Sequence, residues 1–283
     1  MTFDHSPLRR ALKSVCFGLT CAATAAAGAF ALLGLAGCTT PGGYAGELPS
    51  ELHTAQDDSQ ARRHARTRLA LASAYYEGGK TIVALDELKK AMQIDPSFGD
   101  AYNLGGLIYM RLNDMARAES HFERAVSINP GDGNAWHNLG WLRCQQEKYP
   151  AAAQAFQRAA AIPTYPDKAR TLLAEGVCES RAGDRAAAEA SLKRAYALDP
   201  GHPVIAYNLA KLIYLRGDAA SARFYLQRLN SSEYANAETL WLGIQVENKL
   251  NNPQAMQQLA AQLRKDFPDS GEIRLYDRKA FDE

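Results

Sequence analysis

A 34-residue period runs through most of the chain, and it limits the fold more than any other feature of the sequence. Prolines that close amphipathic runs lie 34 positions apart at Pro96 and Pro130 and again at Pro166 and Pro200, and Pro268 follows Pro200 by 68 positions, twice the period. From about residue 62 the apolar residues keep a helical spacing to the end of the chain. Because proline cannot continue a helix, each period is expected to be one closed helical unit.

Small and large side chains keep the same register from period to period. In the second half of each period an alanine is followed four positions later by a large apolar residue. These pairs are Ala84 and Leu88, Ala118 and Phe122, Ala152 and Phe156, Ala188 and Leu192, and Ala222 and Leu226. In the first half the matching small residues are Gly106, Gly140, Gly176 and Ala210. Two antiparallel helices approach closely only where side chains are small, and a large residue then fills the groove between them.

This pattern, together with the stretch Ala135–Gly140, resembles the tetratricopeptide repeat, a helix pair of 34 residues. We therefore predict an all-α fold, a right-handed superhelix of about six tetratricopeptide (TPR) repeats over residues 62–268. The sixth repeat departs from the pattern, with Met256 in place of alanine and Ala260 in place of phenylalanine, as is typical of a terminal unit. An insertion at Ile162–Pro166 is expected to change the superhelical pitch locally. Residues 269–283 are expected to form a tail or capping helix over the last exposed face.

The first 61 residues predict a different organisation. A basic stretch with Arg9, Arg10 and Lys13 precedes an almost wholly apolar segment, as in a secretory signal. Residues 35–38, Leu-Ala-Gly-Cys, resemble the lipobox of bacterial lipoproteins, so residues 1–37 would be a signal peptide and Cys38 the lipidated first residue. Thr39 after the cysteine favours the outer membrane in that family. Residues 38–61 would be a flexible tether. The alternative is an uncleaved transmembrane helix, for which the apolar run is long enough.

Charge and motifs argue against several classes of function. The chain has a formal net charge of +1, and removal of residues 1–37 leaves −1, so no global field attracts nucleic acid. The segment Glu77–Thr81 ends like a phosphate-binding loop, but Ala74 stands where that motif needs glycine, so a helix–helix turn is the preferred interpretation. The six histidines are scattered and show no metal-ligand spacing. We expect no catalytic residues, no metal, no cofactor and no small-molecule substrate.

Two cysteines, Cys144 and Cys178, fall in the predicted repeat domain, 34 residues apart and near the ends of adjacent first helices. Helices stacked about 9–10 Å apart can bring such side chains within disulfide reach. Because the periplasm is oxidising, we predict a disulfide between them. The alternative is two buried thiols.

The first helices of such repeats line the concave face, where register predicts an aromatic and apolar groove with few charges. Such a surface usually marks a protein-binding site. The predicted partner-binding residues are Asn103, Leu107, Met110, His137, Trp141, Tyr207, Lys211 and Tyr214. Trp141, Tyr207 and Tyr214 are expected to contribute most of the binding energy. The alternative is that some of these side chains, Leu107 especially, point into contacts between repeats.

The stretch Asn138–Cys144, the Ile162–Pro166 insertion and the stretch Leu240–Ile244 resemble the type IV pilus biogenesis and stability lipoproteins, the PilF/PilW pilotins, over about residues 69–268. The resemblance implies a pilotin that brings a PilQ-like secretin subunit to the outer membrane and helps it assemble into a ring. We expect a monomer attached to the periplasmic face by its lipid. The competing interpretations are a TPR scaffold of another envelope machine, either a BamD-like barrel-assembly subunit or a scaffold for wall synthesis.

Overall fold

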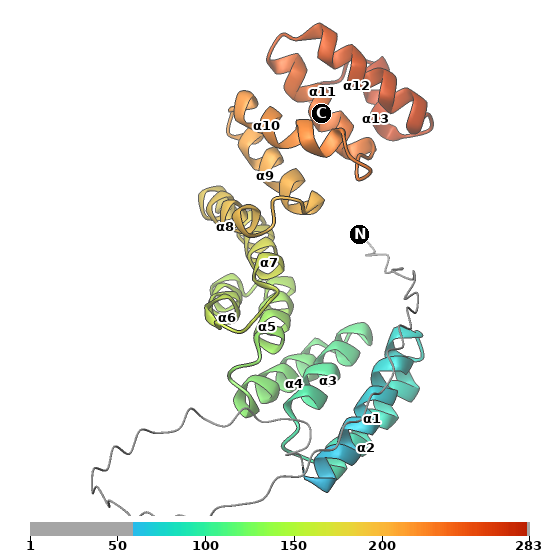
Figure 1. The fold of residues 1–283 in the computed structure, drawn as a ribbon, viewed down its shortest axis with the longest axis vertical. Helices are drawn as coiled ribbons and strands as arrows, with labels where there is room; N and C mark the ends of the chain where they lie inside the picture. Colours follow the sequence, from blue (N-terminus) through green and yellow to red (C-terminus); the bar gives the residue numbers. More distant parts are fainter. Residues whose placement is uncertain (1–58, 282–283) are drawn as a thin grey trace, which may run out of the picture. The chain divides into compact units, whose positions relative to one another are not determined.

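The computed structural model describes residues 59–281, and the predicted signal peptide, Cys38 and most of the predicted tether lie outside this range. Within it the chain forms thirteen helices, of which the first twelve are arranged as six antiparallel pairs (Figure 1). The first helices of the pairs are α1 (Gln60–Glu77), α3 (Gly99–Arg111), α5 (Gly133–Gln145), α7 (Lys168–Arg181), α9 (Pro203–Leu215) and α11 (Ala237–Lys249). The second helices are α2 (Thr81–Ile94), α4 (Met115–Ile128), α6 (Tyr149–Ala161), α8 (Arg185–Leu198), α10 (Ala219–Asn230) and α12 (Pro253–Asp266), and α13 (Gly271–Asp277) follows them. The predicted all-α fold with about six helix-pair repeats is confirmed.

Each pair turns tightly because one residue between its helices takes a left-handed conformation. The residues with positive φ in these six turns are Gly79, Asn113, Glu147, Gly183, Gly217 and Asn251. In four of the turns the next residue then caps the second helix with its side chain, as Asp114 does by accepting a hydrogen bond from the backbone N–H of Arg117 at 3.0 Å. The segment Glu77–Thr81 is such a turn, with φ of 75° at Gly79, and not a phosphate-binding loop.

In the second, third and fourth pairs the two helices touch where a glycine faces a large side chain. A Cβ added at Gly140 on α5 would lie 2.7 Å from Cδ1 of Phe156 on α6, and one at Gly176 on α7 would lie 2.7 Å from Cγ of Leu192 on α8. Phe156 and Leu192 are almost fully buried at these crossings. The glycine therefore sets how closely the helices approach, as the repeat pattern predicted.

The sixth pair reverses the sizes at this crossing. Ile244 on α11 stands at the register position of Gly140, and Ala260 on α12 stands at that of Phe156. Both are buried in one cluster together with Leu263. The large side chain has moved to the first helix and the small one to the second, so the crossing keeps its volume. Ala260 therefore departs from the repeat pattern without leaving a gap, because Ile244 on α11 fills the space that phenylalanine fills in the third repeat.

The last helix covers the end of the stack, as expected for the tail. α13 packs against α11 and α12 and buries Ile273 between them. Beyond it the Phe281 ring stacks on Trp241 at a centroid distance of 6.0 Å. The stack thus ends on a covered apolar face. At its other end α1 begins at Gln60, with Ser59 as its cap, two residues before the predicted start of the repeat domain at residue 62.

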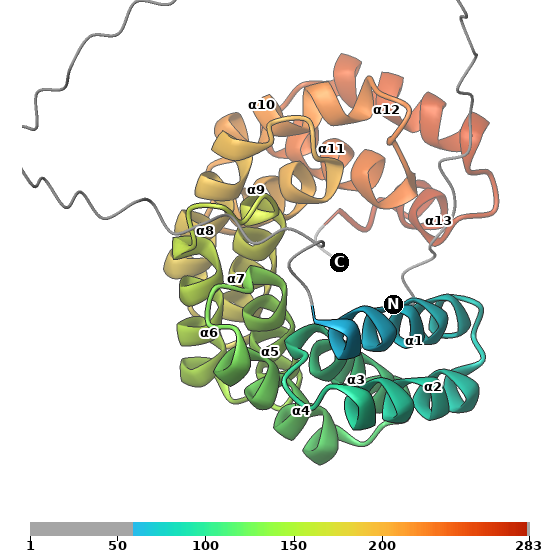
Figure 2. The same cartoon turned by 60° about the horizontal axis from the view of Figure 1, so that its bottom comes forward.

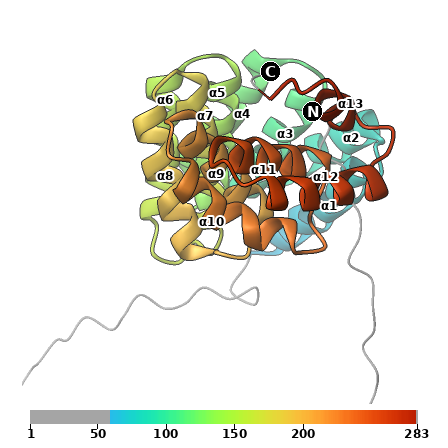
Figure 3. The same cartoon turned by 90° about the horizontal axis from the view of Figure 1, so that it is seen from above.

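The first helices lie on the inner side of the curved stack and the second helices on the outer side. In Figures 2 and 3, α7 and α9 lie inside α6 and α8. Consecutive first helices also contact each other directly along much of this inner side, for example α3 with α5 and α5 with α7. Side chains on the inner surfaces of α3, α5 and α7 therefore form one continuous face, and α9 lies on the same inner side of the stack (Figure 2).

One core position carries a carboxylic acid instead of an apolar residue. Glu175 on α7 is 2% exposed and occupies the register position that holds Leu139 and Leu209 in the neighbouring repeats. Its Oε2 has no hydrogen-bond partner. Burial, and then the nearby Glu179 carboxylate, raise the pKa of Glu175 to about 7, against a smaller opposing effect of Arg194.

We predict that Gly140→Ala lowers the free energy of unfolding by about 1–3 kcal/mol, because the new methyl group overlaps Phe156. The matched control is Gly99→Ala, whose Cβ would meet nothing closer than 3.4 Å. Alanine favours a helix over glycine by about 1 kcal/mol, so the control should be neutral or stabilising. Chemical denaturation measures both. Equal effects of the two substitutions would contradict the role of Gly140 at the crossing.

We predict that Glu175→Gln stabilises the domain at pH 8 by on the order of 2 kcal/mol and changes its stability little at pH 5. The pKa of Glu175 is raised in the folded state, so the folded chain holds more protons than the unfolded chain between about pH 4.5 and 7. The wild type therefore loses stability as the pH rises through this interval, and glutamine removes that loss. Urea unfolding at both pH values measures it, with the exposed Glu77→Gln as control. The same increment at pH 5 and pH 8 would contradict this explanation.

Candidate functional site

The candidate site is the inner face formed by the first helices, where side chains of consecutive repeats contact each other. Between the first and second repeats, the Arg111 guanidinium of α3 lies 3.5 Å from the centroid of the Tyr76 ring of α1 and donates a hydrogen bond to the Tyr76 carbonyl. Between the second and third repeats, Asn138 on α5 donates to Oδ1 of Asn103 on α3 at 3.0 Å. These contacts fix the angle between neighbouring repeats on this face.

Trp141 lies at the middle of the face and is held by its own repeat and by the fourth repeat. It is half-buried against a cluster that contains Cys144, Phe156 and Cys178. The Arg181 guanidinium at the end of α7 lies 5.3 Å from the centroid of its ring. The indole is therefore accessible along part of its surface and fixed along the rest, as is typical of a rigid aromatic anchor.

In the fifth repeat Tyr207 is also paired with charged groups. The Tyr207 hydroxyl donates to Oε1 of Glu238 on α11 at 2.6 Å, and the ammonium group of Lys211 lies 5.6 Å from the centroid of the Tyr207 ring. Burial and the Glu238 carboxylate both raise the pKa of Tyr207 above its usual value. Lys211 is exposed, and Tyr214 is half-buried against the core of its repeat.

The other predicted groove residues contribute less to the open surface. Leu107 and Met110 are half-buried and pack against the core between the second and third repeats. The alternative for Leu107, that it points partly into contacts between repeats, thus describes it better than a free groove position. Asn103 is half-buried and accepts the hydrogen bond from Asn138.

His137 was predicted to lie open in the groove, but the structure buries its ring between repeats three and four. His137 is 9% exposed, its Nδ1 lies 2.9 Å from Oγ1 of Thr171, and the Tyr165 hydroxyl lies 3.1 Å from the same oxygen. Burial, and then the positive charge of Arg170, lower the pKa of His137 to about 4. His137 is therefore a neutral structural residue at neutral pH.

This hydrogen-bonded chain also explains the insertion between repeats three and four. Tyr165 belongs to the inserted segment and is 5% exposed, with its ring packed over Gly133 at the start of α5. Any side chain at position 133 would overlap that ring. The insertion thus places an aromatic side chain at the joint of α5 and α7 and satisfies the polar atoms of His137 and Thr171 there.

Cys144 and Cys178 form a disulfide across the same joint, with their Cα atoms 5.8 Å apart. The bridge links α5 to α7, and the Trp141 side chain packs against the cluster that contains both cysteines. The Tyr165 contact near the start of α5 and the disulfide near its end therefore hold the third and fourth repeats together at both ends of this helix.

Two arginines and a glutamate on this face were not among the residues predicted from the sequence. Arg111 and Arg181 occupy the same register position, one residue beyond Met110 in the repeat, and Glu238 occupies the first turn of its helix. The repeat register would have placed all three on the inner side. The face is therefore a set of aromatic rings bordered by cations rather than an aromatic surface with few charges.

Part of the chain matches models of a known repeat family. Residues 103–169 and 180–239 each match a model described as the tetratricopeptide repeat. These segments run from within α3 to the start of α7 and from the end of α7 to the start of α11. Among the described residues no group of three or more His, Cys, Asp or Glu side chains could hold a metal ion.

The chain is also similar to two proteins with the same architecture over most of its length. It is 26% identical over 242 residues to the type IV pilus assembly protein PilF of Pseudomonas aeruginosa, which covers 86% of this chain and 93% of that protein. It is 30% identical to the solved structure of PilW, described as a widely conserved type IV pilus biogenesis factor, with a TM-score of 0.66, covering 77% of this chain and 99% of that one. The peptide-binding TPR protein YrrB, at 14% identity and a TM-score of 0.55, shares the fold alone.

We predict that the double substitution Cys144→Ser and Cys178→Ser lowers the free energy of unfolding by about 2–4 kcal/mol, because the bridge closes a 34-residue loop in the unfolded chain. Denaturation with and without reductant measures this. Reductant should destabilise the wild type by a similar amount and leave the double variant unchanged. Two alkylatable thiols in the denatured, unreduced protein would contradict the disulfide.

Proposed function

Since the chain belongs to the PilF/PilW family of tetratricopeptide-repeat proteins, we propose that it acts in type IV pilus assembly by binding secretin subunits through the inner face of its repeats. The observation that supports this proposal is the similarity to the PilF and PilW proteins over nearly their whole length. In this role the protein assists the localisation and assembly of a PilQ-like secretin and supports pilus stability.

The inner face offers the chemistry of a protein-binding surface. Trp141 is held rigidly by the disulfide cluster, so ordering it on binding costs little conformational entropy. Arg181 and Lys211 lie beside the rings of Trp141 and Tyr207. A secretin segment that combines an apolar side chain with carboxylates fits this arrangement, because it contacts the rings and pairs with the cations at their edges. Trp141, Tyr207 and Tyr214 remain our candidates for the strongest contributions.

We further propose that a lipid on Cys38 holds the protein at the periplasmic side of the outer membrane. The support is the sequence Leu-Ala-Gly-Cys at residues 35–38 after an apolar segment. Residues 38–58 then provide reach between the lipid and α1. Within residues 59–281 no helix is both long enough and apolar enough to cross a bilayer. The protein acts here as a binding scaffold without catalysis.

We predict that a strain lacking the gene loses the heat-stable secretin multimer from its outer membrane, and that the wild-type gene restores it. A gene carrying Trp141→Ala should restore it poorly, because the substitution removes the central aromatic of the inner face. Unheated gel electrophoresis of fractionated envelopes measures the multimer. The control is Phe224→Ala, which removes an exposed aromatic on the outer helix α10 and should restore the multimer fully.

The same strain separates the competing functions. An intact secretin multimer with defective barrel-protein assembly would favour a BamD-like role, and altered wall synthesis alone would favour a wall-enzyme scaffold. Full restoration by Trp141→Ala, with normal amounts of the protein, would contradict binding through the inner face.

A further inference from the structure

The inner side of the sixth repeat is occupied by a segment of the chain itself. Trp241 and Gln245 on α11 stand at the register positions of Tyr207 and Lys211, the groove residues of α9. Trp241 is 7% exposed, and the ring of Phe281 covers one face of its indole. The two ring centroids lie 6.0 Å apart, and the ring planes are 23° from parallel. Position 241 is therefore closed by residue 281, whereas Tyr207 at the equivalent position is half-buried.

The main chain of the same segment is held by a side-chain amide. Nε2 of Gln245 donates a hydrogen bond to the carbonyl oxygen of Phe281 at 2.9 Å. Because Trp241 and Gln245 lie four positions apart on α11, both side chains leave the same face of the helix. An indole that stacks on a ring and an amide that donates to a backbone carbonyl together suit an aromatic residue in an extended segment.

A tight turn after α13 brings this segment onto α11. α13 begins 34 positions after α11, where a seventh repeat would start, but it has seven residues and α11 has thirteen. At Lys279 the φ angle is 57°, and the N–H of Ala280 donates to the carbonyl of Leu275 at 3.0 Å. The chain therefore turns back at the position where a full first helix would continue.

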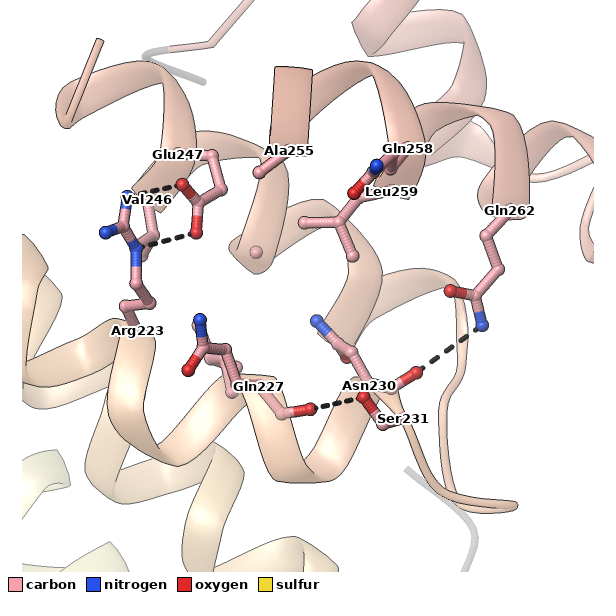
Figure 4. Close-up of a pocket in the computed structure, with 12 residues that line it drawn as sticks. Arg223, Gln227, Asn230, Ser231, Val246, Glu247, Ala255, Gln258, Leu259 and Gln262 are labelled. Atoms are coloured by element: carbon pink, nitrogen blue, oxygen red, sulfur yellow. Dashed lines mark hydrogen bonds and ion pairs between the residues drawn. The ribbon is translucent and has the colours of Figure 1, made fainter. Parts of the chain in front are cut away.

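The other side of α11 is fixed by helices that this segment does not contact. Figure 4 shows the ion pair between α10 and α11, in which Nε of Arg223 donates to Oε1 of Glu247 at 2.8 Å. Near the end of α10, Nδ2 of Asn230 donates to the carbonyl of Thr239 at 3.1 Å. Because these contacts hold α11 from its outer side, the helix is expected to stay in place when Phe281 leaves.

The segment itself is held by few contacts. The described contacts of Phe281 are the stacking on Trp241, one hydrogen bond from Gln245 and an edge contact with the Tyr276 ring at a centroid distance of 6.1 Å. Phe281 is half-buried, and Lys279 adopts a left-handed conformation that residues other than glycine disfavour. A segment with so little buried surface opens locally at a low cost in free energy.

We propose that Trp241 and Gln245 form a binding position for an aromatic residue of an extended partner segment, and that Phe281 fills this position until such a segment displaces it. The partner's ring stacks on Trp241, and its backbone carbonyl accepts from Gln245. The exchange replaces each contact of Phe281 by an equivalent one, so the partner gains affinity from its further contacts with the inner face. The inference rests on the proposed function only in taking the partner to be a secretin segment.

The test uses the full chain, isotopically labelled and purified in detergent, and contains no secretin. The probe is acetyl-lysyl-alanyl-phenylalanine amide, which copies residues 279–281. Nuclear magnetic resonance follows the indole N–H of Trp241 and the side-chain amide of Gln245 during titration. Both signals should shift in a saturable way. The backbone amide signal of Phe281 should move at the same time to its value in an unstructured chain.

Variants of the occupying residue and of the binding position measure the competition. Phe281→Ala empties the position, so the peptide should reach half-saturation at a concentration lower by about tenfold or more than in the wild type. Adding Gln245→Ala to this variant removes one hydrogen bond and should weaken the peptide by about fivefold. Adding Gln257→Ala instead, at an exposed position of the outer helix α12, is the matched control and should change nothing.

Several outcomes would overturn the proposal. These are equal half-saturation in the wild type and in Phe281→Ala, equal binding of acetyl-lysyl-alanyl-alanine amide, and equal losses at positions 245 and 257. If Phe281→Ala fails to fold, the wild type decides alone. Saturable shifts with release of the Phe281 signal then support the proposal, and their absence, or a shift with that signal in place, overturns it. Since no secretin is present, none of these outcomes depends on whether the secretin is the partner.

Discussion

The close crossing of the two helices in each repeat is the contact on which the rest of the structure depends. In the second to fourth repeats a glycine on the first helix lets a phenylalanine or leucine of the second helix pack directly against its backbone, as Gly140 does for Phe156. Alanine takes this position in the first and fifth repeats. The sixth repeat reaches the same volume with Ile244 and Ala260 exchanged. Because the crossing distance is set in this way, the first helices lie side by side on the inner side of the stack. Only this arrangement brings Trp141 and Tyr207, which lie 66 positions apart, onto one face.

The joint between repeats three and four is where the molecule departs most from simple repetition. Tyr165, Thr171 and His137 form a buried polar chain there, and the Cys144–Cys178 disulfide crosses the same two helices. A solenoid is held only by contacts between neighbouring repeats, so a cross-link at one joint stiffens the middle of the stack locally. Trp141 packs against the disulfide of this joint. The joint therefore also holds in place the central aromatic residue of the proposed binding face.

The periodicity of the sequence predicted the helix pairs, their number and the small-against-large crossings, because one register fixes each of these features. It also predicted that Cys144 and Cys178 lie on neighbouring first helices. Periodicity alone did not predict which way a side chain turns from a groove position. His137 shares its register with Asn103 and Tyr207, yet it is buried because the inserted Tyr165 and Thr171 offer it partners. Glu175 and Asn230 likewise became visible only in three dimensions, where each lacks a hydrogen-bond partner for one oxygen.

The central claim is that the inner face, and not the outer one, meets the secretin in the cell envelope. Site-specific photocrosslinking tests this most directly, with a photoreactive amino acid placed either at Lys211, which is exposed on the inner helix α9, or at Gln154, which is exposed on the outer helix α6. After irradiation of living cells, the account predicts a crosslinked product with the secretin from position 211 and none from position 154. Crosslinking to the secretin from position 154 alone, with both proteins present at normal amounts, would contradict it.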